Sequence, residues 1–273
     1  MIPNQDYTTL NFLQIPTTVI APAVSVRRVV QSLAVLALVL LAACETTPDV
    51  QPTPDLTDNA SVELGEIRKL YAAPDCYLAT FSIKGKAAGQ SEQEARGVIR
   101  ADNLNQRLLL IFKDPFLGIT LSRVLIKDGI VTISNPRSDL QRIPLRQFQM
   151  QGLGNNGIQL PFSVFQDLLF ARLPEDLFSN QAKRVLADTQ LDVSLNRAPE
   201  KFQYQFIERR LREINYENSP VAVEVKLTGT YGTTVFPARI DLQALSPGND
   251  RMQIRFLSID PGAVCRESQF SER

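Results

Sequence analysis

Apolar and polar residues alternate with a period of two over most of the chain after residue 76. Between residues 77 and 84 the alternation is typical of a strand with one buried face. The same pattern predicts further strands at residues 92–100, 107–112, 119–127, 130–134, 185–195, 202–207, 212–216, 221–230, 237–245 and 252–259. Turn sequences such as Asp128-Gly129 join neighbouring strands. The chain is therefore expected to form an antiparallel meander.

Two segments carry helical spacing instead. Residues 61–71 place apolar side chains three and four apart, with Glu63 early and Lys69 late, and this helix is expected to end before Pro74. A second helix is expected to begin at Pro161 and to stop before Pro174. These patterns predict an α+β, mainly β fold class, in which about 10–11 antiparallel strands form one strongly curved sheet or an open barrel.

The strongest motif lies near the N-terminus. Arg27 and Arg28 precede a short apolar run, residues 33–41, which ends in Leu-Ala-Ala before Cys44. The run is shorter than the roughly 20 residues that a membrane-spanning helix needs, and it has the order of a signal peptide. We interpret it as a lipobox with lipidation, palmitate included, at Cys44. The alternative is a buried helix with a chance cysteine, and a translation start near Val24 or Val26 would give a shorter signal peptide.

This reading divides the chain into three parts. Residues 1–43 are expected to be the signal peptide, 44–60 a lipidated, disordered tether rich in proline and threonine, and 61–273 one folded domain. With Cys44 assigned to lipid, Cys76 and Cys265 remain as a pair in an exported, oxidising compartment. We predict a disulfide between them; two unpaired thiols are the alternative.

Composition narrows the function. The 29 basic and 29 acidic residues cancel, so charge gives no reason to expect nucleic acid as a partner. The chain has no histidine, which excludes His-dependent nucleophiles and His-metal sites. The glycine-rich segment 152–157 lacks the Lys-Ser/Thr of a phosphate loop and is interpreted as a flexible loop. We predict that the protein is not an enzyme, with no catalytic residues, no metal and no cofactor.

Several short motifs then resemble those of a known family. A strand is followed by Lys-Asp-Pro-Phe-Leu-Gly at residues 113–118 and by another strand. This order is similar to the LolA/LolB family of lipoprotein carriers, and most similar to its outer-membrane branch, LolB. There an Asn-Pro-Leu-Gly loop exposes a leucine that acts in delivering lipoproteins to the membrane. Here Asp114 stands for the Asn, Phe116 is an additional residue, and Leu117-Gly118 match. Residues 160–162 with 171–174, and 237–240 with 252–254, resemble later family segments.

The resemblance implies an unclosed antiparallel β-barrel, or half-barrel, with helices covering the concave face. It also implies an apolar cavity that shelters acyl chains, because such chains lose about 0.8 kcal/mol for each exposed methylene group. The expected lining, for which ordinary core packing is the alternative reading of each residue, is Phe81, Ile83, Val98, Leu108, Leu110, Phe112, Leu121, Phe162, Phe165, Leu169 and Phe170. The expected partners are the membrane through the N-terminal acyl anchor, acylated lipoproteins or lipids, and a periplasmic carrier protein. The expected location is the periplasmic face of the outer membrane.

Phe116 and Leu117 form the expected membrane or cargo loop. Two large apolar residues between Pro115 and Gly118, in a turn, are free to dip into lipid or to touch cargo. The alternative is a loop folded back over the end of the barrel. The function expected for the whole chain is assistance in localising lipoproteins to the outer membrane. The alternative function is a non-catalytic structural or assembly lipoprotein that uses the same fold, with a filled interior, as a protein-docking module.

Overall fold

The computed structural model describes residues 56–136, 138–150, 158–232, 234–246 and 249–272. The expected signal peptide, Cys44, most of the expected tether and the glycine-rich segment 152–157 lie outside the described residues. Among the described helices, none combines the length and the apolar character needed to cross a membrane.

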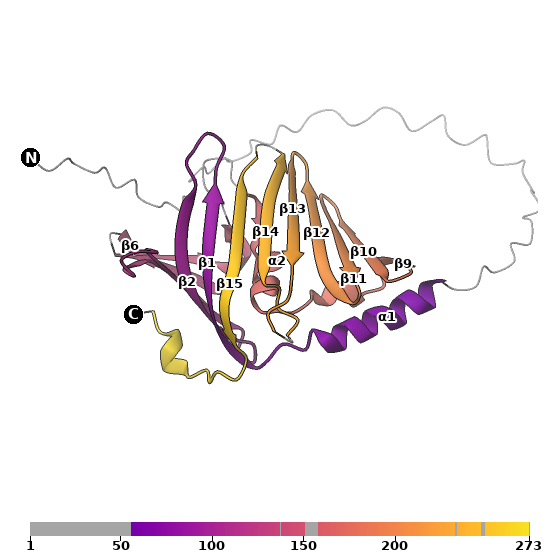
Figure 1. Ribbon diagram of the computed structural model, residues 1–273, viewed down its shortest axis with the longest axis horizontal. Coiled ribbons are helices and arrows are strands. Elements are labelled where there is room, and N and C mark those ends of the chain that lie inside the picture. The colour runs from indigo at the N-terminus through magenta and orange to yellow at the C-terminus, as the bar shows by residue number, and fades with distance from the viewer. Residues whose placement is uncertain (1–55, 137, 151–157, 233, 247–248, 273) are drawn as a thin grey trace, which may run out of the picture.

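One antiparallel sheet dominates the molecule (Figure 1). It contains β1 (Cys76–Lys86), β2 (Gln93–Asp102), β3 (Arg107–Lys113), β4 (Thr120–Lys127), β5 (Ile130–Asn135), β6 (Ser138–Pro144), β9 (Lys183–Ala187), β10 (Gln190–Arg197), β11 (Glu200–Ile207), β12 (Arg210–Asn218), β13 (Val221–Thr228), β14 (Arg239–Ser246) and β15 (Arg251–Asp260). The strand order is β6-β5-β4-β3-β2-β1-β15-β14-β13-β12-β11-β10-β9, so β6 and β9 are its two free edges. The expected unclosed half-barrel is confirmed.

Two sequence expectations about the strands need correction. The described main sheet has 13 strands rather than 10–11. Residues 185–195 hold parts of two strands, because Asp188 takes a positive φ of 51° and turns the chain between β9 and β10. Strand β6 and the short pair β7 (Gln149–Met150) and β8 (Leu160–Pro161) were not expected. Strand β6 is mostly polar, and β7 and β8 have two residues each, so none of them shows a clear alternation of apolar and polar residues.

Two strands far apart in sequence pair in the middle of the sheet. Strands β1 and β15 pair antiparallel from Leu78↔Asp260 to Lys86↔Arg251, with one register shift beside Thr80. This pair joins the hairpins of the N-terminal half, β1–β6, to those of the C-terminal half, β9–β15. Every other neighbouring pair in the main sheet is consecutive in sequence, so β1·β15 is the one link between the halves of the described sheet.

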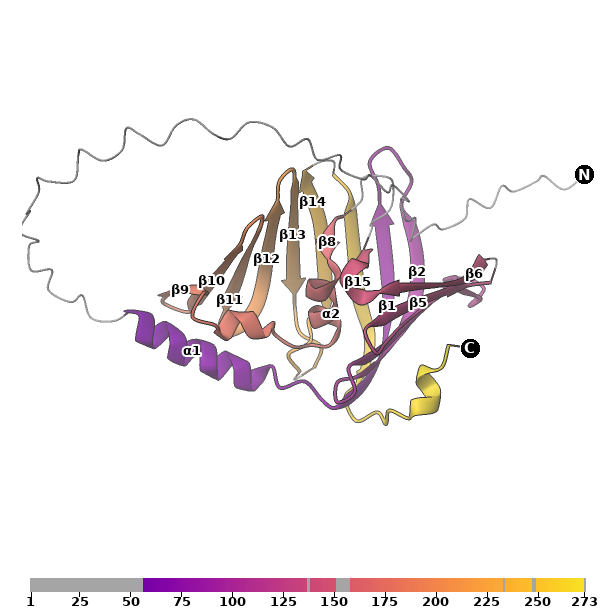
Figure 2. The same cartoon turned by 180° about the vertical axis from the view of Figure 1, so that it is seen from behind.

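The helices take different positions. Helix α2 (Phe162–Leu169) lies against the concave face of the sheet, whereas α1 (Leu56–Leu70) runs along the lower ends of the strands near β9 (Figures 1 and 2). Thus α2 alone of these two covers the concave face. Helix α1 also begins at Leu56, so residues 56–60, expected in the tether, are helical. Ala60, Leu64 and Ile67 of α1 join the main core.

The C-terminal segment returns to the outer face of the sheet. Cys76 and Cys265 form a disulfide with a Cα–Cα distance of 5.7 Å, as expected from the cysteine count. Beyond it the short helix η3 (Glu267–Phe270) buries Phe270 against Leu109 and Leu125, which form a second, small apolar cluster. The C-terminus is therefore fastened to the half of the sheet that holds β3 and β4.

Candidate functional site

An apolar pocket lies between α2 and the concave face of the sheet. It has a volume of about 60 Å³. Its lining is apolar except for one serine and consists of Phe81, Ile83, Ile99, Leu110, Phe112, Ser122, Val124, Phe148, Phe162, Phe165, Leu169, Met252 and Ile254. Seven of the eleven residues expected from sequence line it: Phe81, Ile83, Leu110, Phe112, Phe162, Phe165 and Leu169. The sheet and α2 thus bring together residues from both halves of the chain.

The other four expected residues lie elsewhere. Leu108 and Phe170 are fully buried in the main core but do not line the pocket. Leu121 lies beside the register shift between β3 and β4 and packs against the core from a half-buried position. Val98 was expected on the wrong face, since the inward positions of β2 around it are Gly97 and Ile99.

Gly97 explains both the Val98 error and the shape of the pocket wall. A Cβ atom on Gly97 would lie 2.1 Å from the ring of Phe81, so the glycine makes room for that ring. The Phe81 ring in turn meets the Phe112 ring edge to face, with centroids 5.8 Å apart. Because a glycine carries no hydrophobic side chain, the alternation of β2 cannot be read from apolar residues at this point.

Six lining residues were missed. Ile99 and Val124 follow the alternation of their strands, and correct phasing of β2 and β4 finds them. Met252 and Ile254 reach the pocket only because β15 pairs with β1. The local sequence does not predict this pairing. Phe148 comes from a segment with no predicted element and packs on Phe162 with centroids 4.8 Å apart. Ser122 is the sixth, and its hydroxyl is buried without a hydrogen-bond partner.

A larger open groove adjoins the pocket. It has a volume of about 720 Å³ and shares Phe148 and Phe162 with the pocket. Its other lining is mixed, and comprises Gly129, Pro144, Leu145, Arg146, Gln159, Leu160, Pro161, Ser163, Gln166, Glu200, Tyr216, Asn218 and Val221. The Tyr216 hydroxyl donates to Glu200 Oε1 at 3.2 Å, and burial raises the pKa of Tyr216. The site therefore combines a small apolar pocket with a larger groove of mixed polar and apolar lining.

Helix α2 is fastened at its C-terminal end. Asp167 Oδ1 accepts a hydrogen bond from Arg172 Nε at 2.6 Å, and Arg172 donates to Gln106 Oε1 at 2.5 Å in the β2–β3 turn. Burial raises the pKa of Asp167, and the bond from Arg172 opposes that shift. The rings of Phe162 and Phe165, nearer the N-terminal end of α2, line the pocket with centroids 6.0 Å apart.

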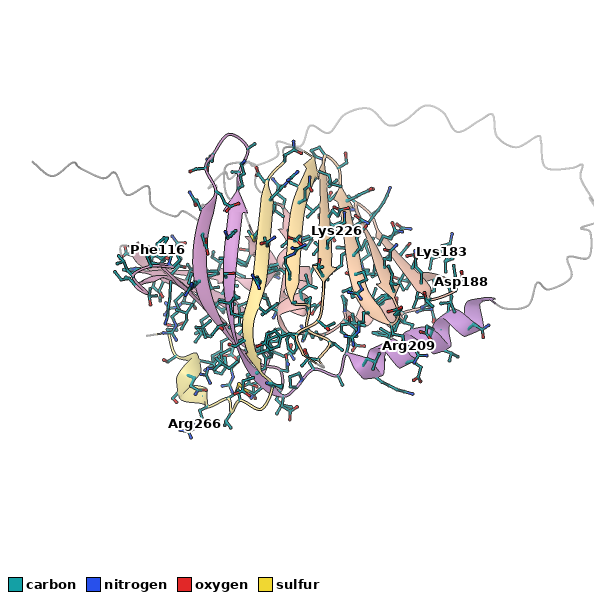
Figure 3. All side chains as sticks on the ribbon, viewed as in Figure 1. Phe116, Lys183, Asp188, Arg209, Lys226 and Arg266 are labelled. Atoms are coloured by element: carbon teal, nitrogen blue, oxygen red, sulfur yellow. A yellow bond between two sulfur atoms is a disulfide. The ribbon has the colours of Figure 1, made fainter. Side chains whose placement is uncertain are left out.

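The loop between β3 and β4 projects its apolar residues into solvent (Figure 3). Asp114 Oδ1 accepts hydrogen bonds from the backbone N–H groups of Phe116 and Leu117, at 2.9 and 2.7 Å. Gly118 takes a φ of +69° and completes the turn. Phe116 is 93% exposed and Leu117 71% exposed, so the loop does not fold back over the barrel. The carboxylate of Asp114 thus supports a rigid apolar tip.

Three solved structures share the architecture of this chain. A LolA superfamily protein from Nitrosomonas europaea matches with a TM-score of 0.52 and 13% identity, over 78% of this chain and 97% of that one. An outer membrane lipoprotein-sorting protein domain from Vibrio parahaemolyticus matches with a TM-score of 0.55 and 12% identity, over 79% and 97%. A DUF1329 family protein from Desulfovibrio piger matches with a TM-score of 0.54 and 10% identity, over 80% and 98%.

Neither protein-family models nor curated proteins give a match. The likeness is therefore one of fold: this chain has the LolA-like fold, an open antiparallel half-barrel, as the sequence motifs predicted.

Proposed function

We propose that this protein binds acyl chains or acylated lipoproteins on the concave face of its half-barrel and assists their localisation to the outer membrane. The observation that carries the proposal is the apolar pocket between α2 and the sheet, which shares Phe148 and Phe162 with the adjoining groove of mixed lining. An amphiphilic ligand fits this order, with its acyl part against the sheet and its polar part in the groove.

The volume of the pocket sets a condition on binding. Ligand pockets typically hold about 300–1,000 Å³, and this one holds about 60 Å³. An acyl chain therefore enters only when the side chains of α2, above all Phe162 and Phe165, move aside. The energy comes from transferring methylene groups out of water, at about 0.8 kcal/mol each.

The proposal includes a location and an anchor. Lipidation at Cys44 and a tether up to the start of α1 at Leu56 hold the domain at the periplasmic face of the outer membrane. Glu45, rather than the Asp that marks retention in enteric-type sorting, follows the lipidated cysteine. Two structural neighbours, a LolA superfamily protein and an outer membrane lipoprotein-sorting protein domain, support this assignment. A periplasmic carrier is the proposed source of cargo.

Filling the pocket tests the proposal. Ser122→Leu places an apolar side chain in the void and removes an unpartnered hydroxyl, so the fold is expected to remain intact. Displacement titration of a fluorescent fatty acid is expected to show affinity reduced about tenfold, as for the loss of one to two buried methylene groups. Ser194→Leu, on the outer face of β10, is the matched control and should bind normally. Equal affinity in both variants contradicts binding in this pocket.

A second candidate is a structural or assembly lipoprotein that docks another protein. The small volume of the apolar pocket favours it, because the side chains of α2 already fill most of the concave face. In that case the fatty-acid probe does not bind the unsubstituted protein, and the rigid tip at Phe116 and Leu117 serves as a protein contact.

A further inference from the structure

A row of basic side chains crosses the outer face of the sheet. The strand register places Lys113 opposite Arg96, Arg96 opposite Ser82, Ser82 opposite Arg255, and Arg255 opposite Arg239. These five residues, which we call the basic row, lie on five neighbouring strands, β3-β2-β1-β15-β14. Neighbouring strands are about 4.8 Å apart, so four cationic groups fall within about 19 Å along one line.

The register and the burial pattern fix the face on which this row lies. On β1, Phe81 and Ile83 line the inner pocket, so Ser82 between them points outward. On β15, Ile254 and Phe256 are buried on either side of exposed Arg255. Figure 3 views this outer face, on which Lys226 is labelled. The basic row is therefore separate from the concave site.

Most of this positive charge is not neutralised within the described protein. Arg239 pairs with Asp241 at 2.7 Å, but Lys113, Arg96 and Arg255 form no ion pair with any described residue. Like charges directly opposite each other in a sheet are destabilising, and Arg255 and Arg239 occupy such positions. An anionic ligand would relieve the repulsion between the cations of the row, of which only Arg239 is paired with an acidic side chain of the described protein.

The acidic groups nearby are already engaged. Glu92 and Glu94 both face Lys84, at 3.6 and 3.4 Å, and this contact with Glu94 raises the pKa of Lys84. Asp114, next to Lys113, accepts the N–H groups of Phe116 and Leu117. These carboxylates therefore leave the central arginines of the row available.

The row also leads to the apolar tip. Lys113 ends β3, and the exposed side chains of Phe116, Leu117 and Ile119 follow within six residues of it. Apolar groups beside a cluster of arginine and lysine are the combination that binds an anionic bilayer, because the apolar groups enter the interface and the cations attract headgroups.

We propose that the basic row docks the outer face of this sheet onto an anionic lipid bilayer, beside the inserted tip. The membrane thereby sets the orientation of the domain, which the proposed lipid anchor at Cys44 does not set by itself. This proposal does not depend on acyl binding in the concave pocket, and either one can fail while the other stands.

Vesicle sedimentation of the full chain tests the proposal, using phosphatidylcholine vesicles with and without phosphatidylglycerol. The readout is the ratio of binding to the two vesicle types. The contribution of Arg27 and Arg28 to this ratio is the same in the unsubstituted chain and in every variant, so differences between variants report on the sheet. The unsubstituted chain is expected to prefer anionic vesicles, and the preference is expected to fall with added salt. Arg96→Ser/Arg255→Ser is expected to reduce the preference about tenfold or more, given the attraction of each cation near such a surface.

Two further variants make the result specific. Arg96→Lys/Arg255→Lys keeps the charge and is expected to keep the preference. Lys183→Ser/Lys201→Ser removes the same charge from exposed positions on β9 and β11, at the far end of the sheet from the tip (Figure 3), and is expected to behave like the unsubstituted chain. The proposal is overturned if the unsubstituted chain shows no preference for anionic vesicles. That result would favour an acidic protein as the partner of the basic row. An equal loss of anionic preference in Arg96→Ser/Arg255→Ser and in Lys183→Ser/Lys201→Ser also overturns the proposal.

Discussion

Replacing Cys76 and Cys265 together by alanine is expected to lower the free energy of unfolding by about 4–5 kcal/mol. The disulfide closes a loop with a sequence separation of 189, so it removes a large share of the conformational freedom of the unfolded chain. It also ties the start of β1 to the segment that carries Phe270. Denaturation in urea, with and without the two substitutions, measures the difference.

The third cysteine provides the control for this experiment. Cys44→Ala removes a cysteine outside the disulfide and is expected to leave the unfolding free energy unchanged. If the double variant unfolds at the same urea concentration and with the same slope as the unsubstituted protein, the disulfide does not stabilise the fold.

Phe116→Glu/Leu117→Glu is expected to reduce delivery of an acylated lipoprotein to vesicles to background. Both side chains are more than two-thirds exposed, so charges there leave the core untouched. They would, however, have to enter the lipid interface, where buried apolar area drives binding and an added carboxylate opposes it. Transfer of a labelled lipoprotein from its carrier to vesicles is the measurement.

The matched control places the same charges on other exposed apolar positions. Leu104→Glu/Val185→Glu changes residues that are 71% and 52% exposed, in the β2–β3 turn and on β9. This variant should deliver cargo normally. Normal delivery by the Phe116/Leu117 variant would instead remove the tip from the mechanism.

Local periodicity predicted most of the sheet because its strands bury one face. The alternation in β1, β5 and β11 was sufficient to place these strands within one to two residues. Periodicity failed in two places where apolar and polar side chains do not alternate. Gly97 occupies an inward position of β2 without a side chain. In β6, polar residues and Pro144 form an edge strand of the sheet.

The candidate site was only partly predictable for a different reason. Residues on β1, β3 and α2 could be named from their own patterns, but Met252 and Ile254 join them through the pairing of β1 with β15, across more than 160 residues. The basic row follows from the same pairing. No local signal in the sequence aligns Arg96 with Arg255, since each residue by itself resembles an ordinary solvated position.

Native mass spectrometry measures whether this half-barrel carries bound acyl chains. The protein from Glu45 onward, which retains all of α1, is exported behind a cleavable signal peptide and purified without detergent. We expect a population with the added mass of lipid or of an acylated peptide, reduced by Ser122→Leu and retained by Ser194→Leu. Repeated preparations that carry no bound lipid, and that take up none when lipid is supplied, would contradict it and favour the protein-docking module.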